Sequence, residues 1–247
     1  MSNLHVIYRT CQLPNKDVER PEWMDNSGHR PKWYDKEKTF KSIFKELDFR
    51  DTLHVLFDGY SENHFLSKYE NIKANFNFKF LEFDGGSDAK SYKFCLDYIN
   101  NNENIEEEDL IYLVEDDYLH KPGWKKILYD GYLSNFTSYW TLFDHPDKYK
   151  DEPEACKIFL SDNCYWRTAA STTNTIAFKK KTFIKHCDIH YKFCDEEAGM
   201  TWDHQKFLEL NEKYNAKVSY PIPGWATHID KRTLSPFVEW EKINETL

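Results

Sequence analysis

Three consecutive carboxylates, Glu115, Asp116 and Asp117, directly follow an apolar segment at 110–114. Neighbouring negative charges repel one another, and burying them is unfavourable unless something neutralises them. A divalent cation does so, and hard carboxylate oxygens favour magnesium, manganese or calcium. We therefore predict a metal site at these three acids. An acidic turn in solvent is the alternative interpretation.

The elements that would position these acids alternate between strand and helix. The predicted strands of the first half are 4–9, 52–57, 78–83 and 110–114, and the predicted helices are 36–47 and 89–99. The run at 110–114 is continuously apolar, as expected for a strand buried on both faces. This order predicts an α/β fold with a mostly parallel central sheet flanked by helices.

The second half of the chain is less regular. We predict strands at 140–143, 173–178 and 216–220, helices at 181–186 and 203–214, and a long loop at 14–31. The polar run at 171–175 leads into a strand, and it either lines a binding site or forms an ordinary β-prone edge. No internal repeat divides the sequence, which favours a single domain over residues 1–247.

Polar and glycine residues follow the predicted parallel strands at the points where these strands end. They are Arg9, Thr10, Asp58, Gly85 and Gly86. Ligands of such sheets bind at the carboxyl ends of the strands, and the two glycines allow close approach to the backbone. A plain turn between strand and helix is the alternative. The sequence has neither a Gly-x-Gly-x-x-Gly fingerprint nor a Gly-Lys-Ser/Thr phosphate loop, so nicotinamide binding and ATP hydrolysis lose support.

Three segments resemble motifs of one enzyme family. The segment 112–117, Tyr-Leu-Val-Glu-Asp-Asp, resembles the metal motif of GT-A-fold glycosyltransferases, in the Glu-Asp-Asp version of the N-acetylglucosaminyltransferase I family. The segment 201–205, Thr-Trp-Asp-His-Gln, resembles the Trp-Asp-Asp segment that carries the catalytic base there, with His204 in place of the second Asp. His228 is similar to the histidine that many GT-A enzymes supply near the C-terminus to the metal or diphosphate.

This resemblance implies a GT-A-like (Rossmann-related) fold and a metal-dependent, inverting glycosyltransferase. The donor would be a nucleotide diphosphate sugar, and the acceptor a glycan or other hydroxyl compound. Asp117 would bind Mn²⁺ or Mg²⁺, with His228 completing the shell, and Asp203 would be the catalytic base. The resemblance also places Glu115 and Asp116 against sugar and ribose hydroxyls.

Family members use the ends of the first two strands, here Arg9, Thr10 and Asp58, to contact base and ribose. The resemblance thus divides the chain into a nucleotide-sugar-binding half, 1–117, and an acceptor-binding half, 118–247. For Asp203, a helix N-cap is the alternative role, and the two roles are compatible.

Composition excludes several other classes of protein. The chain has 247 residues and a formal net charge of −9, which argues against a nucleic-acid partner and a metal nuclease. No apolar run approaches the roughly 20 residues of a membrane span, and no signal peptide is read at the N-terminus, so we expect a cytoplasmic protein. The six cysteines are widely spaced and are predicted to be reduced. The His/Cys group at 186–194 lacks a Cys-x2-Cys half, which disfavours zinc.

Two other functions stay open. A sugar-nucleotide pyrophosphorylase shares the fold type, but such enzymes usually carry a Gly-rich, Arg-containing loop after the first strand, and 9–14 contains no glycine. A non-catalytic carbohydrate- or metal-binding module would not need Asp203 and His228. An assay for donor hydrolysis separates this module from an enzyme.

Overall fold

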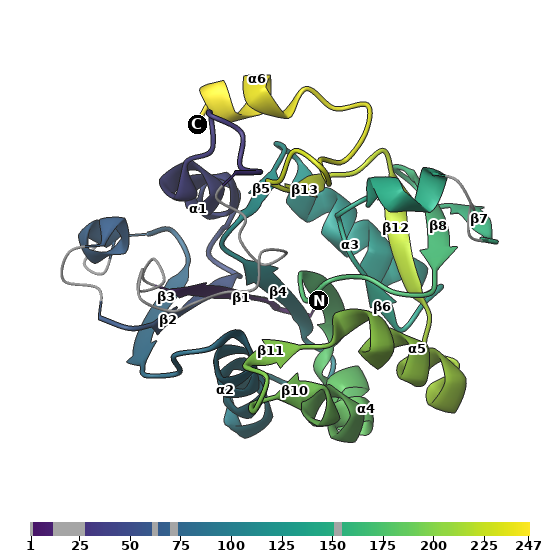
Figure 1. Cartoon of the computed structure of the whole chain (residues 1–247), viewed down its shortest axis with the longest axis horizontal. Helices are drawn as coiled ribbons and strands as arrows, with labels where there is room; N and C mark the ends of the chain where they lie inside the picture. The colour runs from purple at the N-terminus through teal and green to yellow at the C-terminus, as the bar shows by residue number, and fades with distance from the viewer. Residues whose placement is uncertain (1, 12–27, 61–63, 70–73, 151–154) are drawn as a thin grey trace.

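A nine-stranded sheet forms the centre of the computed structural model, which describes residues 2–11, 28–60, 64–69, 74–150 and 155–247 (Figure 1). In spatial order its strands are β3 (Asn77–Phe83), β2 (Thr52–Asp58), β1 (Leu4–Cys11), β4 (Leu110–Glu115), β9 (Ile176–Lys179), β6 (Tyr139–Trp140), β12 (Val218–Ile222), β8 (Tyr165–Ala169) and β7 (Ile158–Leu160). Strands β3, β2, β1 and β4 are parallel neighbours, and β9 and β8 run against the other seven strands. The prediction of a mostly parallel sheet is confirmed.

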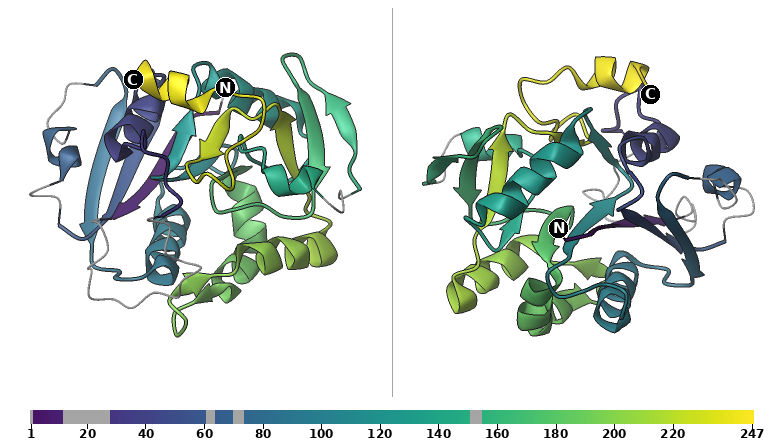
Figure 2. Two further views of the ribbon diagram at one scale, coloured as in Figure 1. Left: turned by 45° about the horizontal axis from the view of Figure 1, so that its top comes forward. Right: turned by 180° about the vertical axis from the view of Figure 1, so that it is seen from behind.

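Helices cover both faces of this sheet (Figures 1 and 2). They are α1 (Lys36–Phe44), α2 (Asp88–Asn101), α3 (Trp124–Ser134), α4 (Lys180–Lys192), α5 (Asp203–Tyr214) and α6 (Trp240–Glu245), with the short 3₁₀ helices η2 (Phe65–Tyr69) and η3 (Pro146–Tyr149). Helices α2, α4 and α5 lie on one face, and α1 and α3 lie on the other (Figure 1). No helix in the described ranges is long and apolar enough to cross a membrane.

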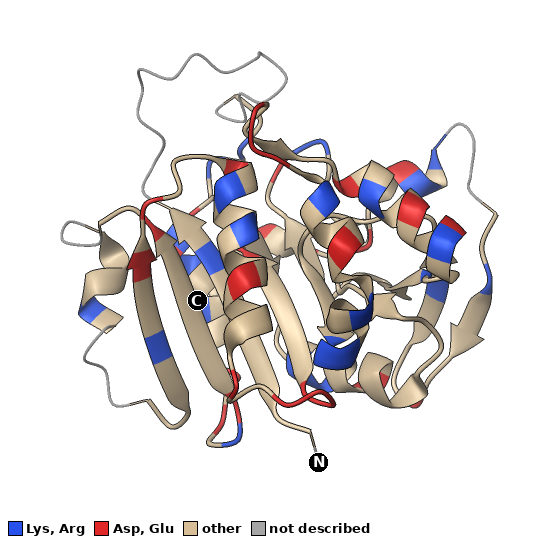
Figure 3. Cartoon of the chain, turned by 90° about the horizontal axis from the view of Figure 1, so that it is seen from below, with Lys and Arg blue, Asp and Glu red and all other residues tan. Residues whose placement is uncertain are grey.

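The alternation of side chains along β4 explains this two-sided packing. Tyr112 and Val114 belong to the core shared with α1 and α3, whereas Ile111 and Leu113 belong to the core shared with α2, α4 and α5. All four side chains are buried, as expected for a strand that is apolar at every position. Charged residues lie on the helices and connections, and the central strands carry few of them (Figure 3).

Two small antiparallel sheets bring distant segments to the main sheet. Strand β5 (Tyr118–His120) pairs with β13 (Ala226–His228), so that His228 lies opposite Tyr118, and Ile229 donates its N–H to the Asp117 carbonyl at 2.9 Å. Strand β10 (Cys194–Asp195) pairs with β11 (Met200–Thr201) just before α5. Neither pair was predicted, because strands of two or three residues have no detectable periodicity.

Several predicted boundaries differ from the structure. The helix predicted at 203–214 is confirmed over its whole length, but 36–47 ends at Phe44, and 181–186 is part of the longer α4. The strand predicted at 140–143 is only Tyr139–Trp140. The strand predicted at 173–178 begins at Ile176, because the polar residues before it bind side chains of the candidate site. Of the predicted loop 14–31, residues 14–27 lie outside the described part of the chain.

Candidate functional site

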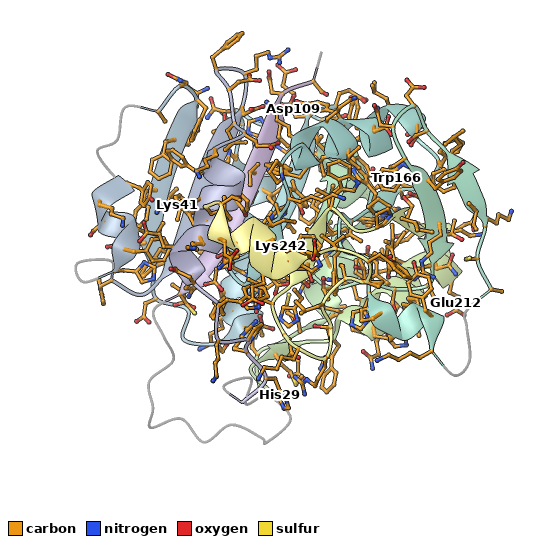
Figure 4. All side chains as sticks on the ribbon, turned by 90° about the horizontal axis from the view of Figure 1, so that it is seen from above. His29, Lys41, Asp109, Trp166, Glu212 and Lys242 are labelled. Atoms are coloured by element: carbon orange, nitrogen blue, oxygen red, sulfur yellow. The ribbon has the colours of Figure 1, made fainter. Side chains whose placement is uncertain are left out.

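The carboxyl ends of β1, β2 and β4 bring most of the predicted residues together. In the register of the sheet Arg9 lies opposite Glu115, and Cys11 lies opposite Asp58. His29 marks this end of the strands in Figure 4, and Asp109, which directly precedes β4, marks the opposite end. The parallel arrangement therefore places three strand ends and the three consecutive acids at one edge.

Glu115 is bound by a guanidinium and a hydroxyl. Arg9 Nη2 donates to Glu115 Oε1 at 2.6 Å, and Thr175 Oγ1 donates to Oε2 at 3.2 Å. The other amino group of Arg9 binds Asp88 Oδ1 at 2.6 Å. Burial raises the pKa of Glu115 to about 7, since it outweighs the opposing effect of Arg9, and the charges of Asp117 and Asp203 act in the same direction as burial. The buried Glu115 carboxyl therefore holds its proton more strongly than an exposed glutamate does.

Asp116 is bound by an ammonium and a hydroxyl. Lys36 Nζ lies 2.6 Å from Asp116 Oδ2, and Thr10 Oγ1 donates to the same oxygen at 2.6 Å. Lys36 also donates to the Cys11 carbonyl at 2.8 Å. Helix α1 begins at Lys36 because Asp35 caps it by accepting the N–H of Glu37. The cap thus places the ammonium over the ends of β1 and β4.

Asp117 shares one oxygen between two cationic groups. Arg30 Nη2 lies 2.6 Å from Asp117 Oδ2, and His228 Nε2 lies 3.0 Å from it. Burial alone would raise the pKa of Asp117, but His228 and Arg30 outweigh it and lower that pKa. Burial likewise opposes the charge of His228, and Asp117 raises the imidazole pKa above its ordinary value.

Protein cations thus neutralise all three acids: Arg9 on Glu115, Lys36 on Asp116 and Arg30 on Asp117. The sequence argument had named only a divalent ion for this purpose. Arg30 and Lys36 were missed because they lie about 80 residues before the acids in the sequence. No local spacing relates residues that only the tertiary fold brings together.

A divalent ion nevertheless fits the pair of Asp117 and His228. Two ligands that each lie about 2.1 Å from an octahedral ion are about 3 Å apart, and the carboxylate oxygen and imidazole nitrogen are 3.0 Å apart. The second ring nitrogen of His228 is held by Thr233 Oγ1 at 2.9 Å, as is usual for a metal-binding histidine. No three His, Cys, Asp or Glu side chains of the described residues form a metal cluster. The pair would therefore supply two ligands to an ion, and the others would come from phosphate and water.

Asp203 is the first residue of α5, and Trp202 occupies the N-cap position without a side-chain capping bond. The N-cap interpretation of Asp203 is therefore wrong. Its Oδ1 is buried and has no hydrogen-bond partner among the described residues, and Lys206 Nζ lies 3.6 Å away. Burial raises the pKa of Asp203, although Lys206 opposes this. The raised pKa makes the Asp203 carboxylate more basic than that of an ordinary aspartate.

A buried polar network behind Asp203 was not predicted. The Lys206 side chain is 1% exposed, and Nζ contacts the Tyr92 hydroxyl at 3.2 Å and the Asn174 side-chain oxygen. Asn174 in turn donates to Thr201 Oγ1 at 2.9 Å. The sequence held one signal for it, since residues three apart on a helix share a face and Lys206 follows Asp203 by three. The polar run at 171–175 therefore contributes to the site through Asn174 and Thr175.

Asp58 fastens the turn that contains the two glycines. Its Oδ1 accepts the N–H groups of Gly85 at 2.8 Å and Gly86 at 3.1 Å. A Cβ atom on Gly85 would lie 2.6 Å from Asp58 Oδ2, and Gly86 has a φ of +73°. Helix α2 begins directly afterwards, with Ser87 as its N-cap. These residues form one structural unit at the end of β2.

A cavity lies away from Glu115, Asp116 and Asp117. It has a volume of about 640 Å³ and is lined in part by Lys157, Lys179, Lys181 and Lys217. Lys217 directly precedes β12, and Lys179 ends β9, which runs in the opposite direction. Both therefore lie at the amino ends of the parallel strands, away from the predicted residues. Cavity size alone would have indicated the end of the sheet opposite to the predicted residues.

Comparison with known proteins identifies the fold of this chain. No protein-family model matches this chain, and no curated protein matches it in sequence. Among solved structures, 2-C-methyl-D-erythritol 4-phosphate cytidylyltransferase (IspD) of Francisella tularensis is similar over 99% of this chain and 98% of its own, at 14% identity and a TM-score of 0.50. Residues 1–349 of TarS from S. aureus are similar over 88% of this chain and 57% of theirs, at 14% identity and a TM-score of 0.48. The likeness to IspD confirms the predicted single-domain, GT-A-like α/β fold.

Proposed function

We propose that this protein is a metal-dependent glycosyltransferase that transfers a sugar from a nucleotide diphosphate sugar to a hydroxyl acceptor. The observation that carries the proposal is the contact between Asp117 and His228, which are 111 residues apart and meet at the carboxyl end of β4. Asp203 lies near the same group, because Arg9 binds both Glu115 and Asp88, and Asp88 accepts a hydrogen bond from Thr201, two residues before Asp203. An acidic turn with a purely structural role would need neither His228 nor Asp203 beside it.

The donor would bind across the ends of β1, β2 and β4. Asp117 and His228 would hold Mn²⁺ or Mg²⁺, which would supply positive charge for the diphosphate leaving group. Arg9 and Thr10 orient Glu115 and Asp116, whose oxygens face the ribose and sugar hydroxyls. Residues 1–117 then form the donor half and 118–247 the acceptor half.

Asp203 would take the proton from the acceptor hydroxyl. A general base works best when its pKa is close to the operating pH, and burial moves the pKa of Asp203 upward from its ordinary value. Lys206, held by Asn174 and Tyr92, fixes the position of the carboxylate without hydrogen-bonding to its buried oxygen. One base opposite the leaving group corresponds to a single displacement, which inverts the anomeric carbon.

Transfer of a nucleotidyl group is a second candidate function. Arg30 and Lys36 lie next to the acids, and cations beside a metal site suit a pyrophosphate leaving group as well as a nucleoside diphosphate. A cytidylyltransferase also has this fold. The two functions differ in their product, because a glycosyltransferase releases a nucleoside diphosphate and a nucleotidyltransferase releases pyrophosphate.

A thermal-shift screen of sugar nucleotides with Mn²⁺ tests the proposal. A ligand at 100 times its Kd stabilises the folded state by about 2.7 kcal/mol, which raises Tm measurably. We expect one class of sugar nucleotide to do so, and Asp117→Asn to remove the shift. Asp188→Asn, in an exposed ion pair on α4, is the matched control and should keep it. Absence of any shift with every sugar nucleotide and metal would contradict the proposal.

A further inference from the structure

Arg30 is fixed on several sides, unlike an ordinary surface arginine. Nη2 binds Asp117 Oδ2 at 2.6 Å, and Nη1 donates to the Ile229 carbonyl at 2.5 Å. The guanidinium lies over the Tyr34 ring, 5.0 Å from its centroid, and the side chain is 19% exposed. Exposed ion pairs contribute little and rearrange freely, but this guanidinium has a defined position on the acidic cluster.

Arg30 and a metal ion would use the same oxygen of Asp117. Oδ2 contacts both Arg30 and His228, so a metal ion that bridges Oδ2 and the imidazole at about 2.1 Å would lie against the guanidinium. A divalent ion would repel the Arg30 guanidinium more strongly than the imidazole does, because it carries a larger charge. A metal ion held by Oδ2 and His228 therefore requires that Arg30 leave this oxygen.

The released guanidinium would have a partner in the proposed donor. A diphosphate brings further negative charge to an edge where Glu115, Asp116 and Asp117 are balanced by Arg9, Lys36 and Arg30. Guanidinium groups bind phosphate oxygens in a forked, bidentate geometry. Of these three cations, Arg30 is the one paired with Asp117, the carboxylate that would bind the metal.

On the basis of the proposed function, we propose that Arg30 is a ligand of the donor diphosphate that Asp117 holds in the free protein. Metal binding to Asp117 and His228 transfers the guanidinium from the carboxylate to the phosphate. Metal and diphosphate then strengthen each other's binding. The metal releases the guanidinium for the phosphate, and the phosphate binds the guanidinium that the metal displaces. The free protein should bind metal weakly, and the complex with a diphosphate should bind it well.

Direct measurement of Mn²⁺ binding tests this inference without any transfer assay. The electron paramagnetic resonance signal of free Mn²⁺ gives its affinity for the protein alone and with inorganic pyrophosphate. In Arg30→Gln we expect ~10-fold tighter Mn²⁺ binding to the protein alone and ~10-fold weaker pyrophosphate binding with Mn²⁺ present, as for loss of one charge-assisted hydrogen bond. Arg50→Gln is the control, since Arg50 also pairs with a carboxylate, Asp48, but lies on the surface.

A second variant separates charge from geometry. Arg30→Lys keeps the positive charge but loses the fork, so it should still weaken Mn²⁺ binding to the protein alone while binding pyrophosphate less well than wild type. Unchanged or weaker Mn²⁺ affinity in folded Arg30→Gln would overturn the competition, as would lack of Mn²⁺ binding in every variant. Unchanged pyrophosphate affinity would overturn the transfer to phosphate. If both effects appear but no sugar is transferred from any donor, the inference stands and the proposed function fails.

Discussion

Replacement of Asp203 by Asn tests the proposed catalytic base most directly. The amide has nearly the size of the carboxylate but no basicity, so the contacts of α5 should be preserved. Loss of a general base lowers turnover by ~10²–10⁴-fold, which corresponds to about 3–5 kcal/mol in the activation barrier. Donor binding should change little, because Asp117 and His228 hold the proposed metal site.

The structure also indicates how this replacement should change the free energy of unfolding. Lys206 is buried, and burial lowers its pKa against the opposing charge of Asp203. Asp203→Asn leaves this ammonium with neutral partners, Asn174 and Tyr92, at a cost of about 1–3 kcal/mol in the free energy of unfolding. A loss of that size does not unfold a protein of ordinary stability, so the effect on turnover can be read separately.

The assay is transfer kinetics at saturating donor, with unfolding midpoints measured on the same samples. Nuclear magnetic resonance of the product gives its anomeric configuration. Asp188→Asn, on the exposed surface of α4, should keep wild-type turnover. Near-normal turnover of folded Asp203→Asn would remove Asp203 as the base, and a retained configuration would reject a single displacement even if Asp203 were essential.

Three further predictions concern the metal, the glycine turn and the effect of pH. Asp117→Asn should abolish Mn²⁺-dependent donor binding, and EDTA should abolish transfer by the wild type; full activity in EDTA would refute the metal assignment. Gly85→Ala should destabilise the fold by about 1–3 kcal/mol, because its Cβ would lie 2.6 Å from Asp58 Oδ2; an unchanged denaturant midpoint would contradict this. Burial lowers the pKa of His54 to about 3, so its protonation favours the unfolded state. Stability should therefore fall as pH drops from about 6.5 toward 3, by up to about 1.4 kcal/mol per unit, and His54→Gln should reduce this slope in urea titrations at pH 7 and pH 5.

Sequence patterns predicted the parts of the fold that depend on local periodicity. The run at 110–114 is apolar at every position, and it is a strand with both faces in the core. The helix predicted at 203–214 is α5, which buries Phe207 and Leu210. Parallel pairing then brings the strand ends together, so the cluster around Glu115 followed from the order of the elements.

The cations of the site could not be predicted in the same way. Arg30 and Lys36 meet the acids only through the tertiary fold, and nothing in their neighbourhood distinguishes them from other basic residues. Lys206 is different, because its spacing from Asp203 on one helix could have identified it. His228 was suggested by family resemblance alone, and the register of β13 against β5 explains why it reaches Asp117.

The pairing of β5 with β13 also determines when the site can exist. During synthesis residue 117 leaves the ribosome long before residue 228, so β5 has no β13 to pair with until most of the chain has been made. An unfinished chain therefore carries the three acids without the imidazole that completes the proposed metal pair. The proposed metal pair would therefore form only once β13 has paired with β5 near the end of the chain.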